Sequence, residues 1–123
     1  MKLSRVISLI DGELLSPIEA ESIEIGGAMG ADLMSDVLTS IQPEAVLLTG
    51  LCNPQVVRTA QIADIRAIIF VRGKDPAVET LQIAIQENIP VIKTKLGLYK
   101  ACGILFQAGL PNYELEAGED CVQ

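Results

Sequence analysis

Three short stretches of the chain contain residue types that bind small anions. Each stretch follows an apolar run and combines glycine or hydroxyl groups with amide or cationic side chains. The stretches are "LTGLCN" with Thr49, Gly50 and Asn53, "VRGKD" with Arg72, Gly73 and Lys74, and "IKTKLG" with Thr94 and Lys95. Cations, hydroxyl groups and the free N–H groups at helix N-termini suit a phosphate or a carboxylate. We therefore expect these residues to bind an anionic small ligand, such as a nucleotide.

The elements that must position these residues repeat one plan three times. Apolar runs that begin near residues 45, 67 and 91 are each typical of a strand followed by a polar loop and a helix. Strand, loop and helix in succession imply right-handed crossovers between parallel strands. The sequence therefore predicts a three-layer α/β/α fold with a largely parallel sheet built from repeated strand-loop-helix units. Ligands bind such sheets outside the carboxyl ends of the strands, where the three stretches would meet.

The remaining segments are predicted from their apolar spacing. The spacing predicts a first helix that ends at Asp11 and Gly12, short strands in "ELLS" and "SIEIG", and a helix from Asp32. The apolar side of that last helix is expected to carry Leu33, Val37, Leu38 and Ile41. A single domain is expected over residues 1–110, and residues 111–123 are expected to form an acidic, flexible tail.

The glycine-rich stretch "EIGGAMGADLMSDVL" is a second candidate for phosphate binding. A P-loop needs Gly-Lys followed by Ser or Thr, and the dinucleotide fingerprint needs Gly-x-Gly-x-x-Gly; the stretch contains neither. Asp32 at the helix start would repel a phosphate and is suited to capping the helix. We therefore interpret Gly26 and Gly27 as a turn and Asp32 as a cap.

The composition argues against most catalytic mechanisms. The chain has no histidine, which removes the commonest general base and metal ligand. Asp32 and Asp36 stand four residues apart and could hold a metal, but a solvated helix face explains them better. Cys52 is the one cysteine in a predicted functional loop. No catalytic residue, metal or cofactor is therefore predicted.

Charge and hydropathy limit the partners. The net charge is −7 and aromatic residues make up 3%, which argues against nucleic-acid binding. No apolar run is long enough to span a membrane, and a cytoplasmic location is expected. Half of the residues are hydrophobic, so a chain of this size is expected to hide some surface in a homodimer.

Several segments together resemble the DRTGG domain family. They are "GADLMSDVL", "LLTGLCNPQVVRTAQIADIRAIIFVRGKDP", "LQIAIQENIPVIKTK" and "ACGILFQAGL", within residues 24–110. Members of that family occur beside CBS domains in regulated pyrophosphatases and in phosphate acetyltransferases, and stand-alone members are similar to the N-terminal domain of HPr kinase. The resemblance implies an α/β regulatory domain that often dimerises and has no established catalytic activity. In the CBS-linked relatives, nucleotides are associated chiefly with the CBS domains.

Residues and resemblance together predict a non-catalytic, ligand-sensing regulatory module. It would bind a small anionic ligand or a regulatory protein partner, and it would act as a homodimer. Two alternatives stay open at this point. One is a phosphoryl- or acyl-transfer enzyme that uses Thr49, Asn53, Arg72 and Lys95, and the other is a structural subunit of a larger complex.

Overall fold

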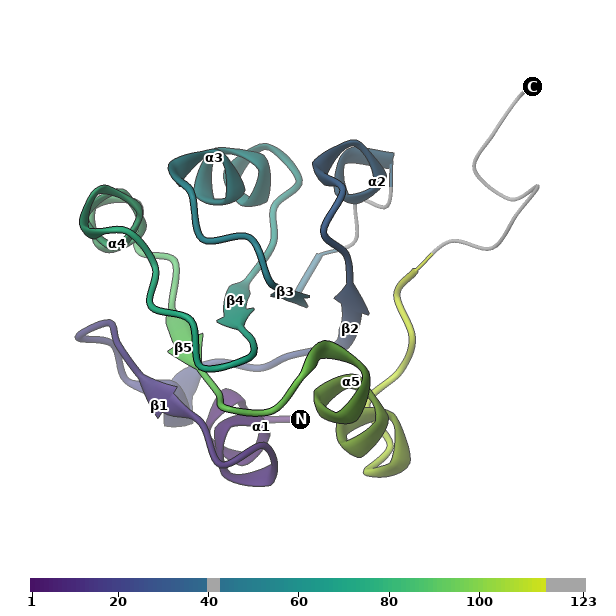
Figure 1. Cartoon of the computed structure of the whole chain (residues 1–123). Helices are drawn as coiled ribbons and strands as arrows, with labels where there is room; N and C mark the ends of the chain where they lie inside the picture. Colours follow the sequence, from purple (N-terminus) through teal and green to yellow (C-terminus); the bar gives the residue numbers. More distant parts are fainter. Residues whose placement is uncertain (40–42, 115–123) are drawn as a thin grey trace, which may run out of the picture.

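A five-stranded sheet of order β1-β5-β4-β3-β2 lies at the centre of the fold, with helices on both faces (Figure 1). The structure, a computed structural model, describes residues 1–39 and 43–114. The strands are β1 (Glu13–Leu14), β2 (Gly27–Gly30), β3 (Ala45–Thr49), β4 (Ala67–Phe70) and β5 (Val91–Lys93). The helices are α1 (Leu3–Leu9), the short 3-10 helix η1 (Ala20–Ser22), α2 (Met34–Thr39), α3 (Pro54–Ile62), α4 (Val78–Gln86) and α5 (Leu98–Gln107).

The pairing of the strands confirms the predicted fold class. Strands β2 to β5 pair in parallel, while β1 pairs with β5 in the antiparallel direction. Helices α2, α3 and α4 cover one face of the sheet, and α1 and α5 cover the other (Figure 1). The three repeated strand-loop-helix units are β3–α3, β4–α4 and β5–α5. Each starts where the apolar runs predict, because both faces of these strands are covered and must be apolar.

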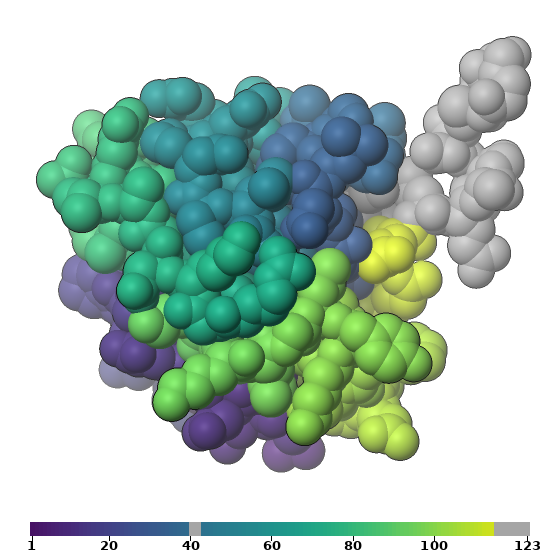
Figure 2. All heavy atoms as spheres, in the orientation of Figure 1, coloured from purple at the N-terminus to yellow at the C-terminus, as the bar shows by residue number. Residues whose placement is uncertain are grey.

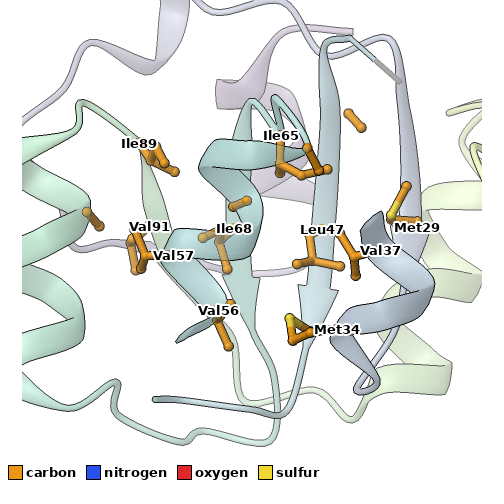
Figure 3. Packing of buried hydrophobic residues seen from close by; sticks show 14 of the residues in the cluster. Met29, Met34, Val37, Leu47, Val56, Val57, Ile65, Ile68, Ile89 and Val91 are labelled. Carbon is orange, nitrogen blue, oxygen red and sulfur yellow. The ribbon is translucent and has the colours of Figure 1, made fainter. Parts of the chain in front are cut away.

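Two apolar clusters fill the space between the sheet and its helices. Alternation along β3 sends Leu47 into the cluster beneath α2, α3 and α4, and Leu48 into the cluster beneath α1 and α5. Figure 3 shows the first cluster, in which Leu47 and Ile68 from the sheet lie among side chains from α2 and α3. Every residue of β3 and β4 is buried, so these two strands hold the two layers together.

The edge strand β2 corrects the prediction of a glycine turn. Gly27 begins this strand, and neither Gly26 nor Gly27 has a positive φ. A Cβ atom on Gly26 would lie 2.6 Å from the Tyr113 hydroxyl oxygen, and one on Gly27 would lie 2.6 Å from ring carbon Cε1. The two glycines therefore allow the Tyr113 ring to approach the strand rather than allowing a left-handed turn.

Residues 111–114 also differ from the predicted tail. Ala28 of β2 donates its N–H to the Pro111 carbonyl at 2.9 Å and accepts the Tyr113 N–H at 2.9 Å. The Gly30 N–H donates to the Glu114 carboxylate at 2.9 Å. The segment thus lies along the outer edge of β2 like a short further strand. The rest of the predicted tail, residues 115–123, lies outside the described residues.

Two other local predictions are wrong. "SIEIG" does not form a strand: η1 ends at Ser22, and Glu24 makes one isolated antiparallel bridge with Lys2. In α2 the buried residues are Met34 and Val37, whereas Leu33 is 61% exposed and Leu38 is half-exposed. Ile41, the fourth residue of the predicted apolar side, lies outside the described residues. The helix begins at Met34, two residues after the predicted start at Asp32.

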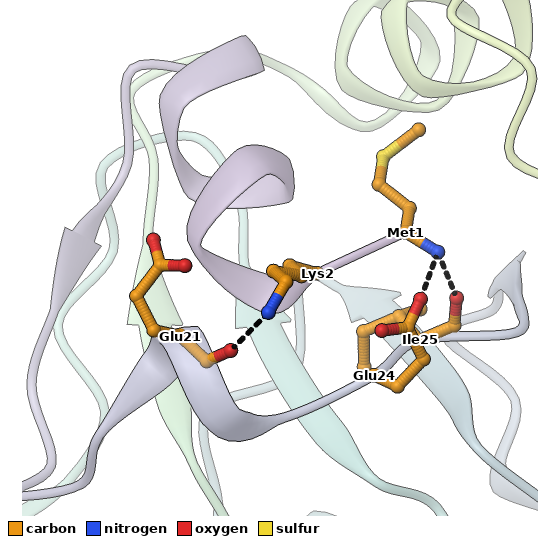
Figure 4. Close-up of polar contacts among 5 residues, drawn as sticks. All are labelled: Met1, Lys2, Glu21, Glu24 and Ile25. Atoms are coloured by element: carbon orange, nitrogen blue, oxygen red, sulfur yellow. Dashed lines mark hydrogen bonds and ion pairs between the residues drawn. The ribbon is translucent and has the colours of Figure 1, made fainter.

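The N-terminal ammonium joins α1 to the segment before β2 (Figure 4). It donates to a Glu24 carboxylate oxygen at 2.7 Å and to the Ile25 carbonyl at 2.9 Å. The Lys2 ammonium donates to the Glu21 carbonyl at 3.1 Å. The hydrogen bond and charge of the N-terminal ammonium lower the pKa of the Glu24 carboxyl group.

This contact predicts a small loss of stability in acid. A carboxyl group whose pKa is lowered by folding stabilises the fold above its unfolded pKa and loses that effect as pH falls through the folded pKa. Urea titrations of the wild type and Glu24→Gln should therefore differ at pH 7 and converge well below pH 4. Glu79→Gln, at an exposed carboxyl of α4 that makes no ion pair within the described residues, is the control and should show a smaller difference, because it loses only a favourable interaction with the start of that helix. An equal difference between wild type and Glu24→Gln at every pH would contradict the expectation.

Candidate functional site

The carboxyl ends of β2, β3, β4 and β5 meet at one edge of the sheet. Because these strands are parallel, the loops after them lie side by side, as the sequence predicts. The predicted ligand residues lie in or beside three of these loops: Gly50–Asn53 after β3, Val71–Ala77 after β4 and Thr94–Gly97 after β5. Figure 2, viewed onto this edge, shows teal, blue and green segments of the chain meeting on one surface.

Asp32 joins the end of β2 to the end of β3. Its carboxylate oxygen Oδ1 accepts the Gly50 N–H at 2.8 Å and the Thr49 hydroxyl at 3.1 Å. The Thr49 hydroxyl in turn accepts the Leu51 N–H at 3.2 Å, and its side chain is fully buried. The prediction of Asp32 as a helix cap is therefore wrong, since its carboxylate supports the neighbouring loop. Thr49 is a part of that support, and its hydroxyl group does not face a ligand.

Arg72 and Gly73 form a tight left-handed corner after β4. Their φ angles are 63° and 66°, a conformation that costs a non-glycine residue such as arginine some strain. The corner is held by two hydrogen bonds to the next loop, from Arg72 N–H to the Leu96 carbonyl at 2.7 Å and from Gly73 N–H to the Thr94 carbonyl at 2.8 Å. These hydrogen bonds therefore connect the loop after β4 to the loop after β5.

The Arg72 side chain returns from this corner across the loop after β3. Its Nη2 atom occupies the space that a side chain at Gly50 would need. Gly50 therefore allows this close approach and has no positive φ, so a larger side chain there would displace the end of the Arg72 side chain. The result is a guanidinium group placed beside the backbone that Asp32 holds, although Arg72 remains exposed.

Three cations stay exposed at this edge. Arg72, Lys74 and Lys95 make no ion pair within residues 1–39 and 43–114. By contrast, the Lys93 ammonium lies 2.6 Å from the Asp75 carboxylate, and this contact raises the pKa of Lys93. Lys93 is thus neutralised by its partner, and the positive charge available at the edge comes from the other three.

The other predicted side chains differ in whether they are free to contact a ligand. They are Thr94, Asn53 and Cys52. Thr94 is buried, donates its hydroxyl to the Ile10 carbonyl at 2.7 Å and accepts the Leu96 N–H at 3.3 Å, so its role is structural. Asn53 is exposed at the start of α3, and its side chain makes no capping hydrogen bond there. Burial raises the pKa of the Cys52 thiol, which outweighs the opposite effect of Lys74. At neutral pH Cys52 is therefore a protonated thiol and a weak nucleophile.

A hollow that the sequence does not signal lies away from the three cations. It has a volume of about 410 Å³ and lies between α5 and β2, with the 110–114 segment along its far wall. Its exposed aromatic side chains are Tyr99 and Phe106. In the part of the chain that the structure describes, no group of three metal-ligating side chains occurs. No described helix is both long enough and apolar enough to cross a membrane.

Comparisons with known proteins support the fold. No protein-family model matches the chain. No curated protein matches it either. The structure is similar to that of the CBS and DRTGG domains of the regulatory region of Clostridium perfringens pyrophosphatase, complexed with the activator diadenosine tetraphosphate. The TM-score is 0.69 at 18% sequence identity over 96% of this chain, and the match spans about half (51%) of that chain. At this identity the likeness supports a DRTGG-like fold.

Proposed function

We propose that the chain is a non-catalytic regulatory module that binds a small anionic ligand of the nucleotide class at the carboxyl edge of its sheet. It would do so as a homodimer in the cytoplasm, and ligand binding would control a protein partner. The observation that carries the proposal is the group of exposed cations, Arg72, Lys74 and Lys95, on two loops that hydrogen bonds tie together.

Different parts of the ligand would contact different residues. The planar guanidinium of Arg72 suits two phosphate oxygens at once, whereas Lys74 and Lys95 supply point charges. Asn53 at the start of α3 adds an amide beside the positive end of that helix. Gly50 gives the Arg72 side chain room to cross the loop after β3, and the buried Thr49 and Thr94 would hold the loops in place.

Two further observations support a regulatory rather than a catalytic role. The similar structure, of which the match spans 51%, is a regulatory region described with a nucleotide activator, so nucleotides are the first ligand class to test. The chain also lacks histidine, and burial raises the pKa of its loop thiol Cys52, so the edge offers neither a histidine base nor an activated thiol nucleophile.

Substitution of Arg72 tests the site. Arg72→Asn removes the guanidinium, and asparagine tolerates the left-handed backbone better than alanine would. Loss of a charged hydrogen bond costs about 1.5–3 kcal/mol, so binding should weaken about tenfold to hundredfold. Isothermal titration calorimetry with ADP, ATP, diadenosine tetraphosphate and inorganic phosphate measures this at low and at physiological salt.

The matched control is Arg66→Asn, which removes an exposed arginine at the opposite edge of the sheet. That variant should bind like the wild type. No heat with any phosphate-bearing ligand, or equal weakening by the two variants, would exclude the site. Turnover of ATP or acetyl phosphate by the wild type would instead favour the transfer-enzyme alternative.

A further inference from the structure

Helix α5 exposes an aromatic surface that the ligand proposal does not use. The chain has two Phe and two Tyr, and two of these four rings, Tyr99 and Phe106, project from α5 with 93% and 68% of their surface exposed. They flank Gly103, where an added Cβ would meet no atom within 4 Å. The three residues stand four and three positions apart, so they share one side of the helix. The surface is thus an open notch between two aromatic side chains.

The notch borders the 410 Å³ hollow. The opposite wall of that hollow is made by the segment that runs along β2, from Leu110 to Glu114. In Figure 1 this yellow segment passes beside α5, so the helix and the segment form the two sides of a groove. Because the segment already fills the outer edge of β2, a partner would meet side chains of α5 here rather than an open strand edge.

The charges of this face suit a second copy of the same chain. Of the 16 acidic residues, none lies in α1 or α5, the two helices of this layer. Two copies that each carry a net charge of −7 repel one another through their acidic surfaces, and a face without acidic helices allows them to approach. Glu114 is the one charged residue among those that line the groove, and Lys100, next to Tyr99 on α5, carries the opposite charge, so each face contributes one charge of either sign.

The spacing of the notch is also self-complementary. In a two-fold dimer each residue contacts its equivalent patch in reverse order. Two α5 helices that cross antiparallel at Gly103 would place the rings of one copy beside the notch and groove of the other. We propose that this face, made by Tyr99, Gly103, Phe106 and the groove beside them, is the homodimer interface of the protein.

The expected contact is small. A helix of ten residues is about 15 Å long, and interfaces of limited size are typical of weaker complexes. Sedimentation velocity from about 1 to 200 µM protein should therefore show a reversible rise from the mass of one chain to the mass of two. A single-chain mass throughout this range would overturn the proposal.

Charge reversal at the notch is the decisive test. Gly103→Glu and Gly103→Lys should each fold, because a side chain there has open space, and each should weaken self-association at least tenfold. Mixing the two variants should restore a dimer, since opposite charges would then face each other across the two-fold axis. Failure of the mixture to associate, or unchanged association of either variant alone, would contradict an interface centred on Gly103.

A second pair of variants tests whether a loss of self-association comes from the α5 face or from a general defect in folding. Phe106→Ser should weaken the dimer, whereas Ile62→Ser, at an equally exposed apolar residue (69%) on the opposite layer, should not. Equal effects of the two would overturn the proposal. These measurements use no ligand, so the dimer face and the anion site can fail separately.

Discussion

Replacing Asp32 with alanine is expected to destabilise the protein by about 2–4 kcal/mol, because it removes the acceptor of two donors at once. The Gly50 N–H and the Thr49 hydroxyl both donate to this carboxylate, and both residues are buried. The Asp32 side chain itself is exposed, so water can partly replace the lost acceptor, and the expected loss lies toward the lower end of this range. The loop beneath the Arg72 guanidinium should loosen as well, and the ligand affinity should fall with it.

Urea denaturation of three variants measures this effect. Asp32→Asn keeps one carbonyl acceptor and should lose less stability than Asp32→Ala. Asp36→Ala is the matched control: this aspartate is exposed on the next helix, and its loss should change stability by less than about 0.5 kcal/mol. Equal stability of Asp32→Ala and Asp36→Ala would mean that the carboxylate does not support the loop.

Replacing Gly27 with alanine is expected to cost about 1–3 kcal/mol, which is typical of overpacking. The added methyl group would enter the space of the Tyr113 ring, and the backbone of Tyr113 is bonded to Ala28 of the same strand. The ring must therefore either rotate away from the strand or shift together with the backbone that is hydrogen-bonded along β2. Gly97→Ala, at a glycine with open space around it, is the control and should cost less than about 1 kcal/mol.

A double-mutant cycle isolates the cause. In a Tyr113→Ala background the space beside Gly27 is empty, so Gly27→Ala should then be nearly neutral. The coupling energy between the two positions should be about 1–3 kcal/mol, within the range for residues in contact. Additive effects of the two substitutions would show that the ring does not lie against the strand.

The sequence predicts the strands whose own side chains form a recognisable apolar pattern. Strands β3, β4 and β5 are covered on both faces, so their apolar runs are visible directly. Strand β2 has the sequence GAMG, which has little side-chain pattern of its own. It is a strand because it pairs with β3 and with residues 111–113. These partners lie far away in the sequence, so the local sequence of β2 does not predict the pairing.

The same distinction applies to the candidate site. The loops that carry Arg72, Lys74 and Lys95 meet as predicted, because parallel strands bring their carboxyl ends together. The hydroxyl groups of Thr49 and Thr94 are both engaged within the fold, since Thr49 continues the inward alternation of β3 and Thr94 donates to the Ile10 carbonyl. Alternation from the buried Leu47 could have signalled the first of these. The hydrogen bond from the Gly50 N–H to the Asp32 carboxylate joins two different loops, and the spacing of residues in the sequence does not reveal it.

The short segment along β2 has a consequence for the behaviour of the protein at high concentration. Exposed strand edges are templates for pairing with other chains, which leads to aggregation. At one end of this sheet, residues 111–113 occupy the hydrogen-bonding groups of Ala28. At the other end, β1 offers two residues, fewer than a stable intermolecular strand needs. Both ends of the sheet are thus protected against the edge-to-edge stacking through which β-rich proteins polymerise.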